Sequence, residues 1–103
     1  MADVKITVID KIAKQELQRQ YGVLDFKDGD DTTCDRFKIG DTFTYGDGDI
    51  VPSGFCAWAW ADIHRDVVAL KNGANFRSKK QEGTQIACCT DGFRPVFFKI
   101  ERI

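Results

Sequence analysis

Apolar and polar residues alternate at the start of the chain, as they do in a strand with one buried face. Val4, Ile6 and Val8 share one parity, with polar side chains between them. Good helix formers then occupy residues 11–21, and Gly22 stops them. The pattern predicts a half-buried strand followed by one short amphipathic helix. The residues expected on the apolar face of this helix are Ile12, Leu17 and Tyr21.

A second helical period runs from Phe55 to Leu70 and predicts the main helix, which Asn72 and Gly73 end. The residues expected on its apolar face are Cys56, Trp60, Ile63, Val67 and Leu70. The polar residues expected on its other faces are Asp62, Arg65, Asp66 and Lys71. This helix is long enough to cover one face of a small sheet.

Three further segments have the alternation of strands. Residues 37–45 alternate around Gly40 and Asp41, which predicts a strand with a bend or bulge. Residues 85–90 predict another strand, joined through 91–94 as a hairpin to a final strand at 95–103. The inward residues of that final strand are expected to be Val96, Phe98 and Ile100. We therefore predict an α+β fold, with a small antiparallel or mixed sheet of about four strands packed against one main and one shorter helix.

Length and composition indicate one domain, residues 1–103, with its own core. The chain has 103 residues, and 43% of them are hydrophobic. A domain of this size and composition folds without obligatory cross-links or metal. A bound metal would therefore be functional rather than the sole source of stability.

The charge balance argues against two classes of partner. Fifteen Lys and Arg face sixteen Asp and Glu, a formal net charge of -1, so nothing attracts nucleic acid or an acidic membrane globally. No apolar run is long enough to cross a bilayer, and the first residues lack the apolar stretch of a signal peptide. We expect a cytoplasmic protein that binds neither nucleic acid nor membrane, while a homo-oligomer and a small-molecule ligand stay open.

Four cysteines carry the candidate chemistry, and their spacing matches no common zinc-finger or disulfide module. Cys56 lies at the predicted start of the main helix, where free backbone N–H groups and the helix dipole stabilise a thiolate. This position favours a nucleophile or a metal ligand. The alternative is a small buried residue on the helix face, because free cysteine is among the most buried residue types.

The other three cysteines differ in what their positions allow. Cys88 and Cys89 are adjacent in a predicted strand, so their side chains point to opposite faces. Cys89, beside the turn at 90–92, is the better site residue, and Cys88 is expected to pack in the core. Cys34 lies at the start of a predicted strand and could converge with Cys56 and Cys89. Three such thiols could hold Zn with one open position, or an Fe–S cluster lacking a fourth protein ligand.

The remaining candidates are aromatic. His64, the single histidine, lies two helical turns beyond Cys56, and we expect a surface or boundary residue rather than a ligand or general base. Trp58 and Trp60, with Phe55, either line a ligand pocket or belong to the core.

Three motifs resemble a family of short, functionally uncharacterised bacterial and archaeal proteins. They are Cys-Asp-Arg-Phe-Lys-Ile-Gly-Asp at 34–41, Pro-Ser-Gly-Phe-Cys at 52–56, and Cys-Thr-Asp-Gly at 89–92 before Pro-Val-Phe-Phe. The order Cys…Lys-x-Gly-Asp, Pro-x-Gly-x-Cys and Cys-x-Asp spans nearly the whole chain. The resemblance implies that Cys34, Cys56 and Cys89 form the site, with Cys88 additional.

Members of this family often have a histidine directly before the lysine of the first motif, where this chain has Phe37. The resemblance thus leaves three arrangements for this chain: an open three-thiolate site, a fourth ligand such as Cys88 or Asp91, or no metal. It supplies no activity, so catalytic residues are not assigned and catalysis stays undecided.

Two functions from different classes follow. The first is a cytoplasmic protein with a three-cysteine site for Zn or an Fe–S cluster, with or without catalysis. The second is a non-metal binding or interaction module, oligomeric or not, whose cysteines are packing or redox thiols.

Overall fold

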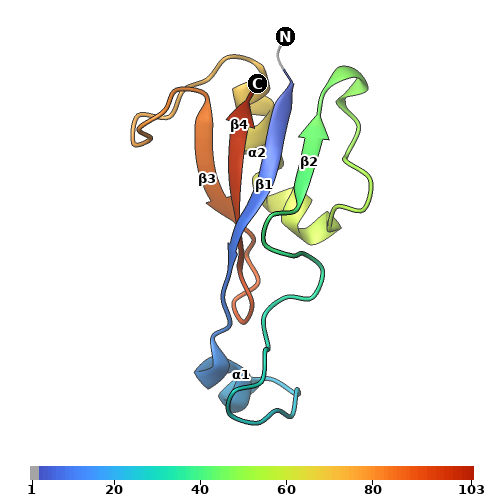
Figure 1. Ribbon diagram of the computed structural model, residues 1–103, viewed down its shortest axis with the longest axis vertical. Helices are drawn as coiled ribbons and strands as arrows, with labels where there is room; N and C mark the ends of the chain where they lie inside the picture. Colours follow the sequence, from blue (N-terminus) through green and yellow to red (C-terminus); the bar gives the residue numbers. More distant parts are fainter. Residues whose placement is uncertain (1–2) are drawn as a thin grey trace.

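The computed structural model describes residues 3–103, which form a four-stranded sheet and two α-helices (Figure 1). The elements in chain order are β1 (Val4–Lys11), α1 (Gln15–Tyr21), β2 (Thr42–Tyr45), the 3-10 turn η1 (Asp47–Asp49), α2 (Ala57–Lys71), β3 (Thr84–Cys88) and β4 (Val96–Arg102). The predicted α+β class is confirmed. No helix in this described part of the chain is long and apolar enough to cross a membrane.

The sheet has the strand order β2-β1-β4-β3, and all neighbouring strands are antiparallel. The central pair joins the two ends of the described chain, with Val4 opposite Arg102. The predicted inward residues of this pair are fully or almost fully buried, namely Val4, Ile6, Val8, Val96, Phe98 and Ile100. Their alternation is visible in the sequence because only one sheet face packs on the core.

Helix α2 covers this buried sheet face (Figure 1). Ile63, Val67 and Leu70 are completely buried, as predicted, and Ala59 joins them. Each large aliphatic side chain buried in this way contributes about 1.5–3 kcal/mol. The apolar stripe of α2 and the inward face of β1 and β4 therefore form the core.

Two polar residues of α2 do not follow the prediction. Asp66 and Lys71 were expected on outer faces, but both are buried. The Lys71 ammonium donates to the Gly46 carbonyl oxygen at 2.8 Å and forms an ion pair with Asp49. Gly46 and Asp49 lie in the connection after β2. They take the place of water around the Lys71 ammonium, which the helical period alone would place on the solvent-facing side of α2.

Helix α1 is shorter and packs differently from the prediction. It begins at Gln15 because β1 continues through Lys11, opposite Val96. Its expected apolar face is wrong, since the side chains of Leu17 and Tyr21 are 41% and 69% exposed. The buried residue is Gln18, which exchanges hydrogen bonds with Thr32. Helix α1 lies beyond the end of the sheet, fixed by polar contacts (Figure 1).

The strand predicted at 37–45 forms only over its second half. A turn precedes it, in which the backbone N–H of Lys38 donates to the Asp41 carboxylate at 2.8 Å and Gly40 has φ +97°. Phe37 is buried all the same, from a loop, because its ring meets those of Phe43, Phe55 and Phe98 at 5.1–5.9 Å. This aromatic cluster fixes the segment that carries Cys34.

Candidate functional site

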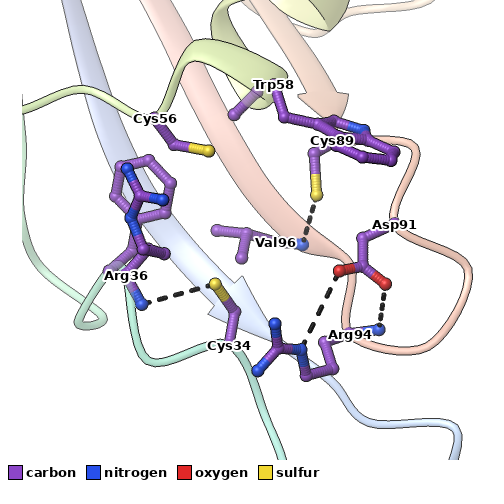
Figure 2. Close-up of a pocket in the computed structure, with 10 residues that line it drawn as sticks. Cys34, Arg36, Cys56, Trp58, Cys89, Asp91, Arg94 and Val96 are labelled. Atoms are coloured by element: carbon purple, nitrogen blue, oxygen red, sulfur yellow. Dashed lines mark hydrogen bonds and ion pairs between the residues drawn. The ribbon is translucent and has the colours of Figure 1, made fainter. Parts of the chain in front are cut away.

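A pocket of about 250 Å³ lies where β4 begins, between the start of α2, the loop before β2 and the connection that follows β3 (Figure 2). Three of the four cysteines line it. Its polar and sulfur-bearing lining residues are Cys34, Cys56, Cys89, Arg36, Asp91 and Arg94. Segments far apart in the chain thus bring together the three thiols that the sequence singled out.

Cys34 is held in place from β1. The Lys11 ammonium donates to the carbonyl oxygens of Cys34 and Phe37, each at 3.0 Å. The backbone N–H of Arg36 donates to the Cys34 sulfur at 3.4 Å (Figure 2). A single lysine at the end of β1 therefore anchors the loop, and the loop turns a backbone donor toward the thiol.

Cys56 directly precedes α2 and is its N-cap residue. Its carbonyl oxygen accepts the N–H of Trp60 at 2.9 Å, and its own backbone is extended. The preceding turn closes when Phe55 N–H donates to the Pro52 carbonyl oxygen at 3.2 Å, with Gly54 at φ +78°. The predicted position at the helix start is confirmed. The Cys56 side chain is half-buried against the core.

Cys89 follows β3, and α2 fixes the residue beside it. The backbone N–H of Thr90 donates to the Asp62 carboxylate at 2.7 Å, and the indole N–H of Trp58 donates to the Thr90 hydroxyl at 2.8 Å. The Cys89 sulfur accepts the backbone N–H of Val96 at 3.4 Å. Cys89 is therefore held between the helix that carries Cys56 and the start of β4.

Cys88 takes no part in the pocket. Adjacent strand residues point to opposite faces, as predicted, and Cys88 is exposed while Cys89 is buried. The expectation that Cys88 packs in the core is wrong. The reason is its strand, since β3 is at the edge of the sheet and Cys88 lies on the face opposite α2, across from Phe97.

Two charged side chains of the pocket, Arg36 and Arg94, were missed from the sequence, whereas Asp91 was named as a possible fourth ligand. Arg94 Nε lies 3.8 Å from the Asp91 carboxylate, which also accepts the backbone N–H groups of Phe93 and Arg94 at 2.9 and 3.0 Å. Asp91 is thus engaged by its own turn. Arg36 has no hydrogen-bond or ion-pair acceptor for its guanidinium among residues 3–103. The available signal was its position two residues after Cys34.

The aromatic candidates divide between pocket and core. Trp58 forms a wall of the pocket. Trp60 packs against Phe55 and Tyr45 instead, at ring distances of 5.7 and 5.4 Å. His64 is exposed, its ring lies tilted against that of Trp60 with the centroids 5.2 Å apart, and it does not line the pocket.

The thiols share the pocket without forming a closed ligand set. In residues 3–103, no three His, Cys, Asp or Glu side chains lie close enough together to hold a metal ion, and all four cysteines are free thiols. Of the two fourth ligands that the resemblance left open, Asp91 lines the pocket and Cys88 does not. The site is therefore an open, thiol-lined pocket with anchored backbones.

Comparisons with models of known families, with curated proteins and with solved structures find no match to this chain. The resemblance to the family of short uncharacterised proteins thus stays a prediction from the motifs. The chemistry of the pocket has to be argued from its own residues.

Proposed function

We propose that this protein binds a metal through Cys34, Cys56 and Cys89, either as Zn²⁺ or as an Fe–S cluster. The observation that carries the proposal is the shared pocket, which gathers three thiols from three separate segments. Thiolates are soft ligands that favour zinc and iron–sulfur clusters over hard cations. Three of them leave one coordination position for water, a substrate or a non-protein ligand.

Hydrogen bonds to the sulfurs support this use of the thiols. Backbone N–H groups donate to Cys34 and Cys89, each at 3.4 Å. Such donors are the outer contacts that hold and tune metal ligands. Two of the three candidate ligands therefore already have the support that a metal–thiolate bond requires.

Metal binding requires the pocket to close, because the sulfurs are not at ligand distance from a common centre. A cysteine side chain has one rotatable bond before its sulfur, so rotation moves the sulfur while the backbone stays fixed. The backbone anchors, Lys11 for Cys34 and Asp62 for the Cys89 segment, hold these two segments beside the pocket. A bound Zn²⁺ with an open position would supply Lewis-acid chemistry.

The proposal includes a cytoplasmic location, where thiols stay reduced and available to metal. It also includes membership of the family of short uncharacterised proteins, for which Cys34, Cys56 and Cys89 would be the matched positions. Both rest on the sequence motifs and on the pattern of free thiols.

The test is the metal content of protein purified without oxygen, together with acid-labile sulfide and an absorption spectrum. We expect near-stoichiometric zinc, or iron with sulfide. Replacing any one of Cys34, Cys56 or Cys89 by Ser should remove most of the metal, whereas the exposed Cys88→Ser is the matched control and should retain it. A metal-free wild-type protein, or metal content unchanged in the pocket variants, would overturn the proposal.

A second function is favoured by a specific observation around helix α1, away from the sheet. Apolar side chains around α1 are exposed, with Tyr21 at 69%, Val23 at 104% and Leu24 at 54%. An apolar surface of this kind is typical of an interaction module, which is the non-metal alternative. Val23→Asp should then abolish concentration-dependent association in light scattering without changing metal content. A monomeric wild-type protein at all concentrations would remove the oligomeric form of this alternative.

A further inference from the structure

The unpaired guanidinium of Arg36 distinguishes the pocket from a purely structural cluster. Most arginines of the chain contact a carboxylate or carbonyl oxygen, namely Arg19, Arg65, Arg94 and Arg102. Arg36 and Arg77 have no such acceptor in residues 3–103, and only Arg36 lines the pocket. The two form a natural pair for comparison, since both side chains are exposed.

The charges of the pocket leave one positive charge uncompensated. Asp91 faces Arg94 at 3.8 Å, so these two offset each other. Arg36 is then the only charged side chain of the lining that has no partner of opposite charge among residues 3–103. Its planar guanidinium presents paired donors that match a carboxylate. One carboxylate would accept hydrogen bonds from the Arg36 guanidinium and neutralise its charge.

The rest of the lining sets the kind of molecule attached to that head group. Trp58, Phe37, Ala59 and Val96 give the pocket apolar walls, and its volume of about 250 Å³ admits a small molecule only. Apolar walls with a few polar groups that fix orientation are the usual features of a small-molecule site. A compact organic acid with an apolar body fits this combination better than a nucleotide or a bare inorganic anion.

We propose that the pocket binds a small organic monocarboxylate, with its carboxylate on Arg36 and its apolar body against Trp58. The inference goes beyond the metal proposal, because it depends on the arginine and the apolar walls rather than on an ion. When a metal is bound to the thiols, the same carboxylate would lie beside the open coordination position.

Benzoate and its neutral isostere benzamide provide the test, titrated calorimetrically at fixed ionic strength into protein whose metal content is measured in parallel. We expect saturable binding of benzoate, and binding of benzamide and of inorganic phosphate at least about tenfold weaker. Arg36→Gln should weaken benzoate binding about tenfold, the effect of losing a charge-assisted hydrogen bond. Arg77→Gln should leave it unchanged.

Several outcomes would overturn the inference: no saturable binding of benzoate, equal binding of benzamide or phosphate, or equal losses in the two arginine variants. A lowered zinc content in Arg36→Gln with benzoate binding intact would show that the arginine only offsets thiolate charge. Arg36→Lys keeps the positive charge but loses the paired donors of the guanidinium, so its affinity for benzoate should be intermediate. This variant replaces Arg36→Gln in the test if the Gln variant does not fold. Metal-free protein that binds benzoate would refute the metal proposal alone.

Discussion

The two ends of helix α2 differ in how their polar groups are used. At the C-terminal end, Lys71 reaches Gly46 and Asp49, and the Arg102 guanidinium donates to the carbonyl oxygens of Leu70 and Ala74 at 2.8 and 2.9 Å. At the N-terminal end, the Arg36 guanidinium has no acceptor in the described chain, and free thiols line an open pocket.

The difference is between charged groups that have internal partners at one end of α2 and a charged group that has none at the other. A charged group whose partners are all internal stabilises the fold and has nothing left for a ligand. A charged group without partners beside a pocket contributes little to stability and is available for recognition. The comparison therefore supports the proposal that the pocket at the N-terminal end binds a ligand, and measurements of stability and binding at both ends test it.

The largest expected effect is on stability at the C-terminal end. Arg102→Ala removes charge-assisted hydrogen bonds to three acceptors, including the Asn75 side chain at 2.8 Å. We expect the free energy of unfolding to fall by about 2–3 kcal/mol. Arg36→Ala, the matched change at the pocket, should alter it by no more than about 0.5 kcal/mol. Urea titrations of both variants measure the difference, and equal losses would erase the distinction between the two ends.

A smaller effect is expected where α2 holds Cys89. Asp62→Ala removes the acceptor of the Thr90 N–H and hydroxyl, so the hydrogen bond from Trp58 to the Thr90 hydroxyl is the remaining anchor of the segment on α2. We expect zinc affinity to fall about tenfold, the usual cost of losing an outer contact of a metal ligand.

Chelator competition measures this affinity, with the exposed Asp25→Ala as control. A second measurement, the reactivity of Cys89 with a thiol reagent, does not require a bound metal. In a variant whose other three cysteines are replaced by Ser, Cys89 should react faster when Asp62 is replaced by Ala. Unchanged affinity together with unchanged reactivity would show that Thr90 does not need the Asp62 carboxylate.

The smallest effect is a pH dependence at the C-terminal end. The hydrogen bond from Lys71 lowers the pKa of Asp49 below its ordinary value of 3.8. A depressed folded-state pKa gives stability that is present above the unfolded pKa and is lost as pH falls through the folded one. Asp49→Asn should therefore lose less stability than the wild type between about pH 5 and pH 2.

Unfolding by urea at a series of pH values checks this slope. The pKa of Asp31 is also lowered, by its hydrogen bonds with Thr33, so Asp31→Asn is the comparison variant, remote from α2. If the free energy of unfolding has the same pH dependence in the wild type and in Asp49→Asn, the ion pair between Lys71 and Asp49 does not stabilise the protein in solution.

The sequence predicted those parts of the fold in which burial has a period. The inward residues of β1 and β4 and the stripe of α2 repeat because each element packs one face on the same core. The buried side of helix α1 could not be predicted from an apolar period, because the hydrogen-bonded polar pair Gln18 and Thr32 holds the helix against its neighbouring loop. The strand at 37–45 was predicted too long because Phe37 shares the parity of Phe43, although it is buried from a loop.

The candidate site was predictable only at the level of element ends. Cys34, Cys56 and Cys89 each lie next to a turn or helix start, where loops meet, and this placed them together in one pocket. Which charged residues join them depends on how the loops cross, so Arg94 gave no sequence signal, and the only signal for Arg36 was its position two residues after Cys34. The contact of Asp62 with Thr90 spans two elements and has no local pattern.

The pairing of β1 with β4 has a consequence for the order of events during synthesis. Val4 lies opposite Arg102, so the central ladder has one of the largest sequence separations that this chain allows. Contacts of such long range form late and slow folding. Cys34 and Cys56 leave the ribosome well before β4, which carries the backbone donor to the Cys89 sulfur. Until that strand arrives, the thiols belong to an open chain and are exposed to oxidants and to competing metals.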